Sequence, residues 1–137
     1  MDVKNALYPT GERLGALIND TSLAPIVMLN LLKFRAKAEY ADGRATKLTG
    51  FEAYNLYGDA MQKIVAREGG KVLFVGQINS LVIGMVEDMW DAAALVEYPS
   101  AADFARITTL PQVTEIGVHR AAGLQGQLLI RVSPRAG

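Results

Sequence analysis

The sequence predicts a single α+β domain built on a split βαβ unit, in which a four-stranded, mainly antiparallel sheet carries helices on one face. Three observations support this prediction. Apolar runs of strand length alternate with segments of helical periodicity. The 137 residues suit one domain, which we expect to span residues 1–137. Half of the residues are hydrophobic, which is enough to form a folded core.

The composition excludes several classes of function. Fourteen basic and 14 acidic residues give a net charge of zero, whereas a nucleic-acid binder needs clustered positive charge. The chain has no cysteine and one histidine, and it has no phosphate-binding or dinucleotide-binding glycine motif. We therefore expect neither a metal nor a cofactor.

The chain also shows no sign of membrane insertion or export. Its start has no basic segment followed by an apolar one, as a secretory signal would have. No apolar run reaches the roughly 20 residues that a membrane span needs. We expect a cytoplasmic protein that does not bind membranes.

The N-terminal third predicts a short helix and then a strand. Thr10 is a suitable N-cap for a helix that ends in the polar residues 19–22. This helix forms an N-terminal extension over about residues 8–24. The apolar run 26–34 is too short for a typical helix and predicts the first strand.

A longer helix follows the loop at residues 35–48. Thr49 and Glu52 form a capping box, which places the start of the helix. The apolar stripe continues to about Glu68, where Gly69-Gly70 supplies a residue that tolerates positive φ and ends the helix.

The second half predicts two strands, two helices and a last strand. The strands are expected at 71–77 and 90–98, and residues 80–84 continue the first of them or pair with it. Ser100 and Asp103 form a second capping box, in its aspartate form, and Leu110-Pro111 ends the helix that it opens. Another helix over 112–120, ended by Gly123, precedes a strand at 128–132. Without the N-terminal helix the order is βαββαβ, which is the ferredoxin-like arrangement.

The first strand predicts a dimer. Ile26, Met28, Leu32 and Phe34 point to one side, and Val27, Leu29 and Leu31 point to the other. The second strand repeats the pattern, with Val72 and Phe74 opposed by Leu73 and Val75. Both faces must then be dry, and the helices of one chain cover only one. We expect a second copy to cover the other face with two-fold symmetry; the alternative cover is the long N-terminal segment.

Several segments together resemble a known family. They are Asn30-Leu31-Leu32-Lys33-Phe34, Tyr57-Gly58, Gly69-Gly70, Trp90-Asp91, Val96 to Ser100, Phe104 and Arg120 to Leu124. Over about residues 8–132 the chain is similar to the small bacterial domain-of-unknown-function family thirteen-thirty, of the dimeric α/β-barrel (ferredoxin-like) superfamily. At Gln112-Val113 the sequence departs from the aromatic residue that the family usually has after the proline. The resemblance implies the fold and a dimer; relatives in the superfamily include cofactor-less monooxygenases, isomerase-like and dehalogenating enzymes, and stress-response or binding proteins.

Asn30 is the most informative single residue. It lies in an apolar strand on the same face as Met28 and Leu32, where an unpaired carboxamide would cost free energy. It either presents a fixed donor and acceptor to a ligand or bonds to the backbone of a loop.

Glu97 and His119 are the candidates for proton transfer. A partly buried glutamate has a raised pKa and acts as a general base, whereas the alternative is an ion pair with Arg120 or Lys33. Histidine is the side chain whose unperturbed pKa lies near neutrality, and His119 is the one histidine of the chain. The alternative for His119 is a capping or surface residue. We expect Glu97 and His119, as catalytic residues, to approach one cavity from a strand end and a helix end.

A further set is expected to bind the substrate. Tyr54 and Tyr57 share the inner stripe of the long helix, and buried tyrosine hydroxyls need partners. Tyr98 and Trp90 lie at the two ends of one strand, and Arg120 would bind an anion beside His119. The alternative for each aromatic residue is a place in the core.

Two functional hypotheses follow. The first is a cofactor-independent enzyme acting on a small organic molecule in a pocket between sheet and helices. The second is a non-enzymatic dimer that binds a small ligand or is associated with stress.

Overall fold

The computed structural model describes residues 2–134 of the chain. Four helices and four strands follow one another as α1 (Gly11–Ile18), β1 (Ile26–Phe34), α2 (Gly50–Arg67), β2 (Lys71–Gln77), β3 (Ala92–Tyr98), α3 (Ala101–Thr108), α4 (Pro111–Gly123) and β4 (Leu124–Val132). None of the helices in the described residues is both long and apolar enough to cross a membrane.

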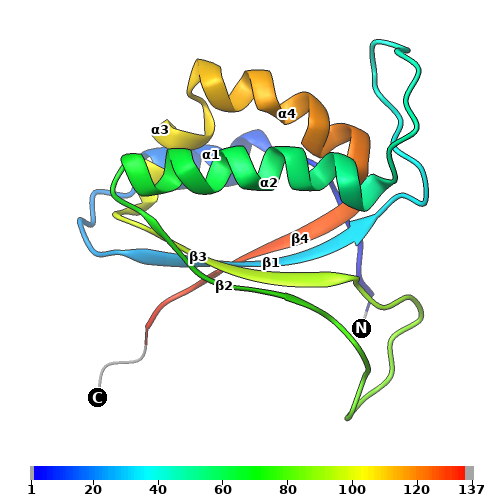
Figure 1. Cartoon of the computed structure of the whole chain (residues 1–137). Helices are drawn as coiled ribbons and strands as arrows, with labels where there is room; N and C mark the ends of the chain where they lie inside the picture. The colour runs from blue at the N-terminus through cyan, green and yellow to red at the C-terminus, as the bar shows by residue number, and fades with distance from the viewer. Residues whose placement is uncertain (1, 135–137) are drawn as a thin grey trace.

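The four strands form one antiparallel sheet in the order β2-β3-β1-β4, and all four helices lie on one side of it (Figure 1). This arrangement confirms the predicted ferredoxin-like fold. The first strand has the predicted bounds, 26–34, and so has the second, 71–77.

Local sequence signals fix where the helices begin and end. The side chain of Thr49 accepts from the backbone of Glu52, and the Glu52 carboxylate accepts from the backbone of Thr49 at 2.9 Å. Ser100 caps α3 in the same way, but the Asp103 carboxylate accepts from the Ser100 hydroxyl rather than from its backbone. Gly69 has φ of +90°, as expected for the residue that ends α2.

Three strand predictions are corrected by the structure. Residues 80–84 belong to a loop, with Gly84 at φ of +104°, and β3 begins at Ala92 instead of residue 90. β4 begins at Leu124, four residues earlier than predicted. It does so because the polar Gln127 continues the pairing with β1, opposite Leu32.

A register shift in β2 corrects the predicted faces of that strand. Val72 pairs with Val96, which faces the helices, whereas Phe74 pairs with Leu95, which faces away. The bulge between them inserts one residue, so that Val72 and Phe74 lie on opposite faces and not on one. As a result Phe74 is 58% exposed on the side of the sheet without helices.

The core lies between the sheet and the helices. Ile26 and Met28 of β1 pack there with Ile64 and Val65 of α2 and Ile107 of α3. All five side chains are buried, so this layer contributes most of the hydrophobic stabilisation of the fold.

Two glycines let the ends of α2 and α4 cross at close range. A Cβ at Gly123 would lie 2.3 Å from the carbonyl oxygen of Gly50, and a Cβ at Gly50 would lie 2.1 Å from that of Arg35. The Arg35 amide donates to the Gly123 carbonyl at 2.8 Å, which ties the end of β1 to this crossing. Gly123 is therefore required by close backbone approach.

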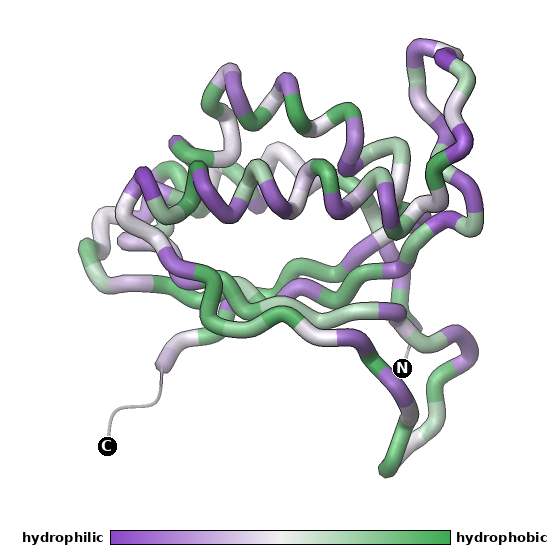
Figure 2. Tube along the Cα trace, in the orientation of Figure 1, coloured by the Kyte–Doolittle hydropathy of each residue, from purple (hydrophilic) through white to green (hydrophobic). Residues whose placement is uncertain are grey.

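The face of the sheet opposite to the helices is apolar, and no helix of residues 2–134 lies on it. By register, β1, β3 and β4 place Val27, Leu29, Leu31, Leu95, Leu128, Ile130 and Val132 on it. Figure 2 shows the hydrophobic colouring of these strands. The alternative prediction, that the N-terminal segment covers this face, is wrong, because its helix α1 packs against α3 on the other side of the sheet.

Candidate functional site

A chain of polar side chains connects α4 to the middle of the sheet. Nη2 of Arg120 donates to Oε1 of Gln127 at 2.7 Å, and Nε2 of Gln127 donates to Oδ1 of Asn30 at 3.2 Å. Nδ2 of Asn30 donates to the carbonyls of Met28 and Ala94 at 3.3 and 3.4 Å. Asn30 is half-buried. Its carboxamide bonds to the backbone of β1 and β3 and to the side chain of Gln127, and not to the backbone of a loop.

Three tyrosines lie in the same layer between sheet and helices. Tyr54 and Tyr57 project from α2 with ring centroids 5.5 Å apart, and Tyr98 comes from β3. Burial raises the pKa of all three hydroxyls, and the nearby Arg120 charge partly opposes the rise in the pKa of Tyr54 and Tyr57. At neutral pH the three groups are therefore neutral and act as hydrogen-bond donors.

The three tyrosine hydroxyls have no protein partner among the described residues. None of them forms a hydrogen bond with residues 2–134, although their rings are largely buried. None of these oxygens is fully enclosed either, because the Nε atom of Arg35 is the one enclosed and unpaired side-chain atom in that range. Each hydroxyl oxygen therefore keeps a small exposed surface.

The N-terminal segment at residues 5–8 closes one side of this layer. Ala6 pairs with Gln127 at the free edge of β4, and the Leu7 carbonyl accepts from Nη2 of Arg120. The ring of Tyr8 lies 5.4 Å from the Arg120 guanidinium carbon.

Trp90 is connected to the same segment. It precedes β3 instead of starting it, and its Nε1 donates to Oδ1 of Asn5 at 2.8 Å. Trp90 therefore lies beside the N-terminal segment, at the edge of the layer between sheet and helices, and not beside the tyrosines of α2.

Glu97 lies elsewhere. It is opposite Val27 in the register, between two residues that face the helices, so its side chain is on the other face of the sheet. Neither proposed ion pair forms: Arg120 bonds to Leu7 and Gln127, and Lys33 pairs with Asp88 and Asp91.

His119 is engaged by the loop that follows β1. Its Nδ1 lies 2.7 Å from the hydroxyl of the buried Tyr40, and the two rings meet edge to face. Glu97 and His119 are on opposite sides of the sheet, so the expectation that they share one cavity is wrong. The contact with Tyr40 could not be read from the sequence because 79 residues separate the pair.

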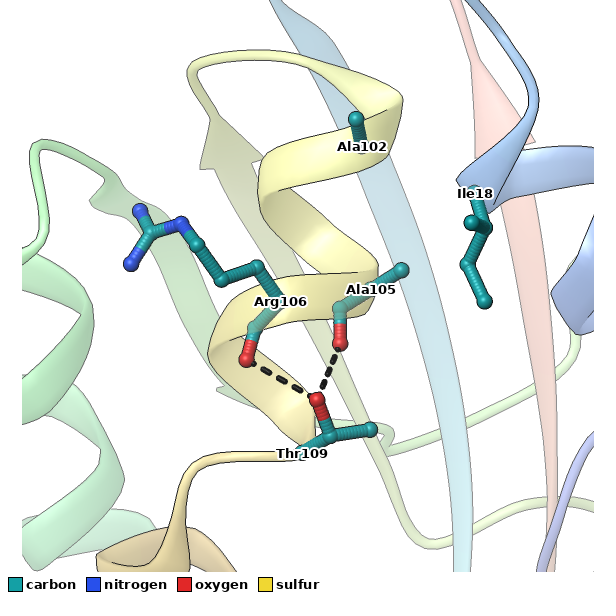
Figure 3. A pocket seen from close by; sticks show the side chains of 5 residues that line it. All are labelled: Ile18, Ala102, Ala105, Arg106 and Thr109. Carbon is teal, nitrogen blue, oxygen red and sulfur yellow. Dashed lines mark hydrogen bonds between the residues drawn. The ribbon is translucent and has the colours of Figure 1, made fainter.

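Two hollows in the described residues lie away from all of these side chains. One, of about 200 Å³, lies between Ile18 at the end of α1 and α3, where Thr109 donates to the Ala105 carbonyl (Figure 3). The other, of about 520 Å³, is an open depression on α2 beside Asp59 and Lys63. Neither is lined by a predicted site residue.

Gln127, Leu7 and Tyr8 were not predicted as site residues from the sequence. Gln127 carries the same signal as Asn30, a carboxamide in a strand, but it falls before the predicted start of the last strand. Leu7 and Tyr8 carry no signal, because Leu7 acts through its carbonyl and Tyr8 through its position above Arg120.

Comparison with solved structures finds close relatives. The RPA0582 protein of unknown function from Rhodopseudomonas palustris is 34% identical, with a TM-score of 0.86 over 98% of this chain and 100% of its own. The methylated form of RPA0582 is 36% identical over 98% of both chains. No model of a protein family matches the chain, and no curated protein matches it.

More distant structures share the fold alone. A dimeric protein of unknown function from Bacteroides fragilis is 14% identical, with a TM-score of 0.52 over 79% of this chain and 94% of its own. SnoaB, a cofactor-independent oxygenase from Streptomyces nogalater, is 10% identical, with a TM-score of 0.52 over 83% of this chain and 96% of its own. Both support the fold that the sequence predicted and nothing finer.

Proposed function

This chain belongs to the same family as the RPA0582 protein of Rhodopseudomonas palustris, whose function is unknown, and we propose one function for both proteins. Each is a homodimer that binds a small, partly apolar organic molecule. The proposed site lies between the sheet and the helices. It contains Asn30, Tyr54, Tyr57, Tyr98 and Arg120, with Trp90 at its edge.

The observation that carries this proposal is the set of unpaired tyrosine hydroxyls. Buried polar groups normally have hydrogen-bond partners, because an unpaired group pays the cost of desolvation. Tyr54, Tyr57 and Tyr98 have none in residues 2–134, and their oxygens are not fully enclosed. A bound molecule with acceptor atoms would supply the missing partners.

The proposed dimer forms through the uncovered face of the sheet. Leu29, Leu31 and Ile130 share this face, and Phe74 adds a large exposed ring to it. The loop between β2 and β3 extends to the same side and exposes Val82, Ile83 and Met85 almost fully (Figure 1). An apolar surface of this extent favours self-association, and one neighbour with this fold is described as dimeric.

A cofactor-independent enzyme is the second candidate, as a neighbour with this fold is described as a cofactor-independent oxygenase. Tyr54 and Tyr57 would then donate to a developing negative oxygen in the substrate. Binding is the better supported function, because Glu97 is on the other face of the sheet and Nδ1 of His119 is engaged by Tyr40. A stress-associated role would use the same binding site.

The motif Asn30 to Phe34 and the segment Val96 to Ser100 support a finer assignment. On these residues we propose that the chain belongs to the domain-of-unknown-function family thirteen-thirty. That the chain forms a single domain and that it lies in the cytoplasm are predictions from the sequence.

Calorimetric titration with benzamide, an uncharged aromatic probe, tests the binding function. Wild-type protein should bind it, and Asn30→Leu should weaken binding, because the loss of the Asn30 oxygen releases Gln127, which holds Arg120 in the site. Asn55→Leu is the matched control, because Asn55 is exposed on α2. Equal losses in the two variants would contradict the proposal, and so would a wild type that binds neither benzamide nor benzoate, a probe of nearly the same shape.

A further inference from the structure

The guanidinium of Arg120 has free hydrogen-bond donors. Of its five N–H groups, the two on Nη2 point to Leu7 and Gln127. Nε and Nη1 have no partner in residues 2–134, and neither atom is fully enclosed. Three N–H groups on a positive charge are thus available to a ligand.

Arg120 also has no carboxylate partner among the described residues. Six other basic residues form ion pairs there, at 2.6–3.6 Å: Lys33, Arg35, Arg44, Arg67, Arg106 and Arg131. Arg120 is half-buried, and a charge withdrawn from water without a counter-charge is unfavourable. An anion bound beside it would offset that cost.

The surroundings of Arg120 offer donors and aromatic surface. Arg120 is on α4, which packs against α2, the helix that carries Tyr54 and Tyr57. Its charge partly opposes the rise in the pKa of these two hydroxyls, which are themselves unpaired donors. Gln127 uses its oxygen on Arg120, and Asn30 uses its oxygen on Gln127, so the nearby carboxamide acceptors are occupied. The ring of Phe34 packs against that of Tyr54 with centroids 5.3 Å apart, so Tyr54 has an apolar neighbour.

We propose that the ligand of this site is a small aromatic carboxylate, whose negative oxygens accept from Arg120 and from the hydroxyls of Tyr54 and Tyr57. This inference rests on the proposed binding function and adds the chemical class of the ligand. Charge-assisted hydrogen bonds from arginine to carboxylate are stronger than neutral ones, so the carboxylate is the group that these donors select. Tyr8, which is 68% exposed, places its ring 5.4 Å from the guanidinium carbon and adds aromatic surface to the site.

The experiment compares two probes of nearly the same shape, benzoate and benzamide, by calorimetric titration. Wild-type protein should bind benzoate about tenfold more tightly than benzamide. Arg120→Gln should abolish this preference, and Arg120→Lys should restore part of it. Arg13→Gln, which removes an exposed arginine on α1, should leave the preference unchanged.

The ratio of affinities in the wild type needs no variant, so the test stands even if Arg120→Gln fails to fold. If benzamide binds as tightly as benzoate, the carboxylate inference is wrong while the binding function stands. If Arg120→Gln folds and keeps the preference, the inference is equally wrong. If neither probe binds the wild type, the binding function fails and this inference with it.

Discussion

Arg120 on α4 and Gln127 on β4 are joined by a hydrogen bond of 2.7 Å, and this bond connects the helix layer to the sheet. The pair is seven residues apart, on either side of the junction where α4 ends and β4 begins. Gln127 passes the contact on to Asn30 in the neighbouring strand. The polar interior of the fold is therefore one connected chain and not a set of separate residues.

Replacing Gln127 by leucine should destabilise the protein by about 1–3 kcal/mol, because it removes the partner of both Arg120 and Asn30. The free energy of unfolding in urea measures the effect. Gln125→Leu is the matched control, since Gln125 is an exposed residue of the same strand. Equal effects of the two substitutions would show that the chain contributes nothing to stability.

Replacing Leu29 by aspartate should convert the dimer to a monomer, because it places an unpaired charge in the proposed dry interface. Light scattering coupled to size-exclusion chromatography at micromolar concentration gives the mass of the particle. Leu23→Asp should leave the dimer intact, since Leu23 is 89% exposed in the loop before β1. A monomeric wild type would rule out the dimer.

Two glycines of one helix should respond to alanine in opposite directions. Gly123→Ala should destabilise by more than about 1 kcal/mol, because the new Cβ would lie 2.3 Å from the Gly50 carbonyl oxygen. Gly117→Ala has open space around its Cβ and should stabilise α4 by up to about 1 kcal/mol. Thermal unfolding of both variants checks the prediction, and a neutral Gly123→Ala would refute the close crossing.

Stability should fall in alkaline solution because of the buried tyrosines. Burial raises the pKa of Tyr54, Tyr57 and Tyr98 above their ordinary value of 10.0. The unfolded chain then loses these protons first, so their contribution is complete below pH 10 and is lost as pH rises toward the folded pKa values.

Urea unfolding at a series of pH values measures this loss. Each tyrosine should contribute a slope of up to about 1.4 kcal/mol per pH unit above pH 10. Tyr57→Phe should reduce the total slope. A free energy of unfolding that does not change between neutral pH and about pH 11 would contradict the burial of these groups.

Much of the fold could be predicted from local sequence, because its signals act within a few residues. The cap at Thr49 involves a residue three positions away, and the stop at Gly69 depends on its own φ. The apolar run 26–34 likewise predicted a strand with the bounds that the structure has. Its two apolar faces are the basis of the dimer, which stays a prediction. Asn30 was predicted to be a site residue because a carboxamide in such an apolar run requires hydrogen-bond partners.

The tertiary structure decided which side chains meet. Glu97 and His119 are 22 positions apart and were predicted to share a site, but strand alternation puts Glu97 on the face without helices. The bulge after Val72 moved Phe74 to that same face, and no residue pattern marked it. Arg120 finds Leu7 across 113 residues of chain. Such contacts depend on the register of strands and on the packing of whole elements, which the sequence near each residue does not encode.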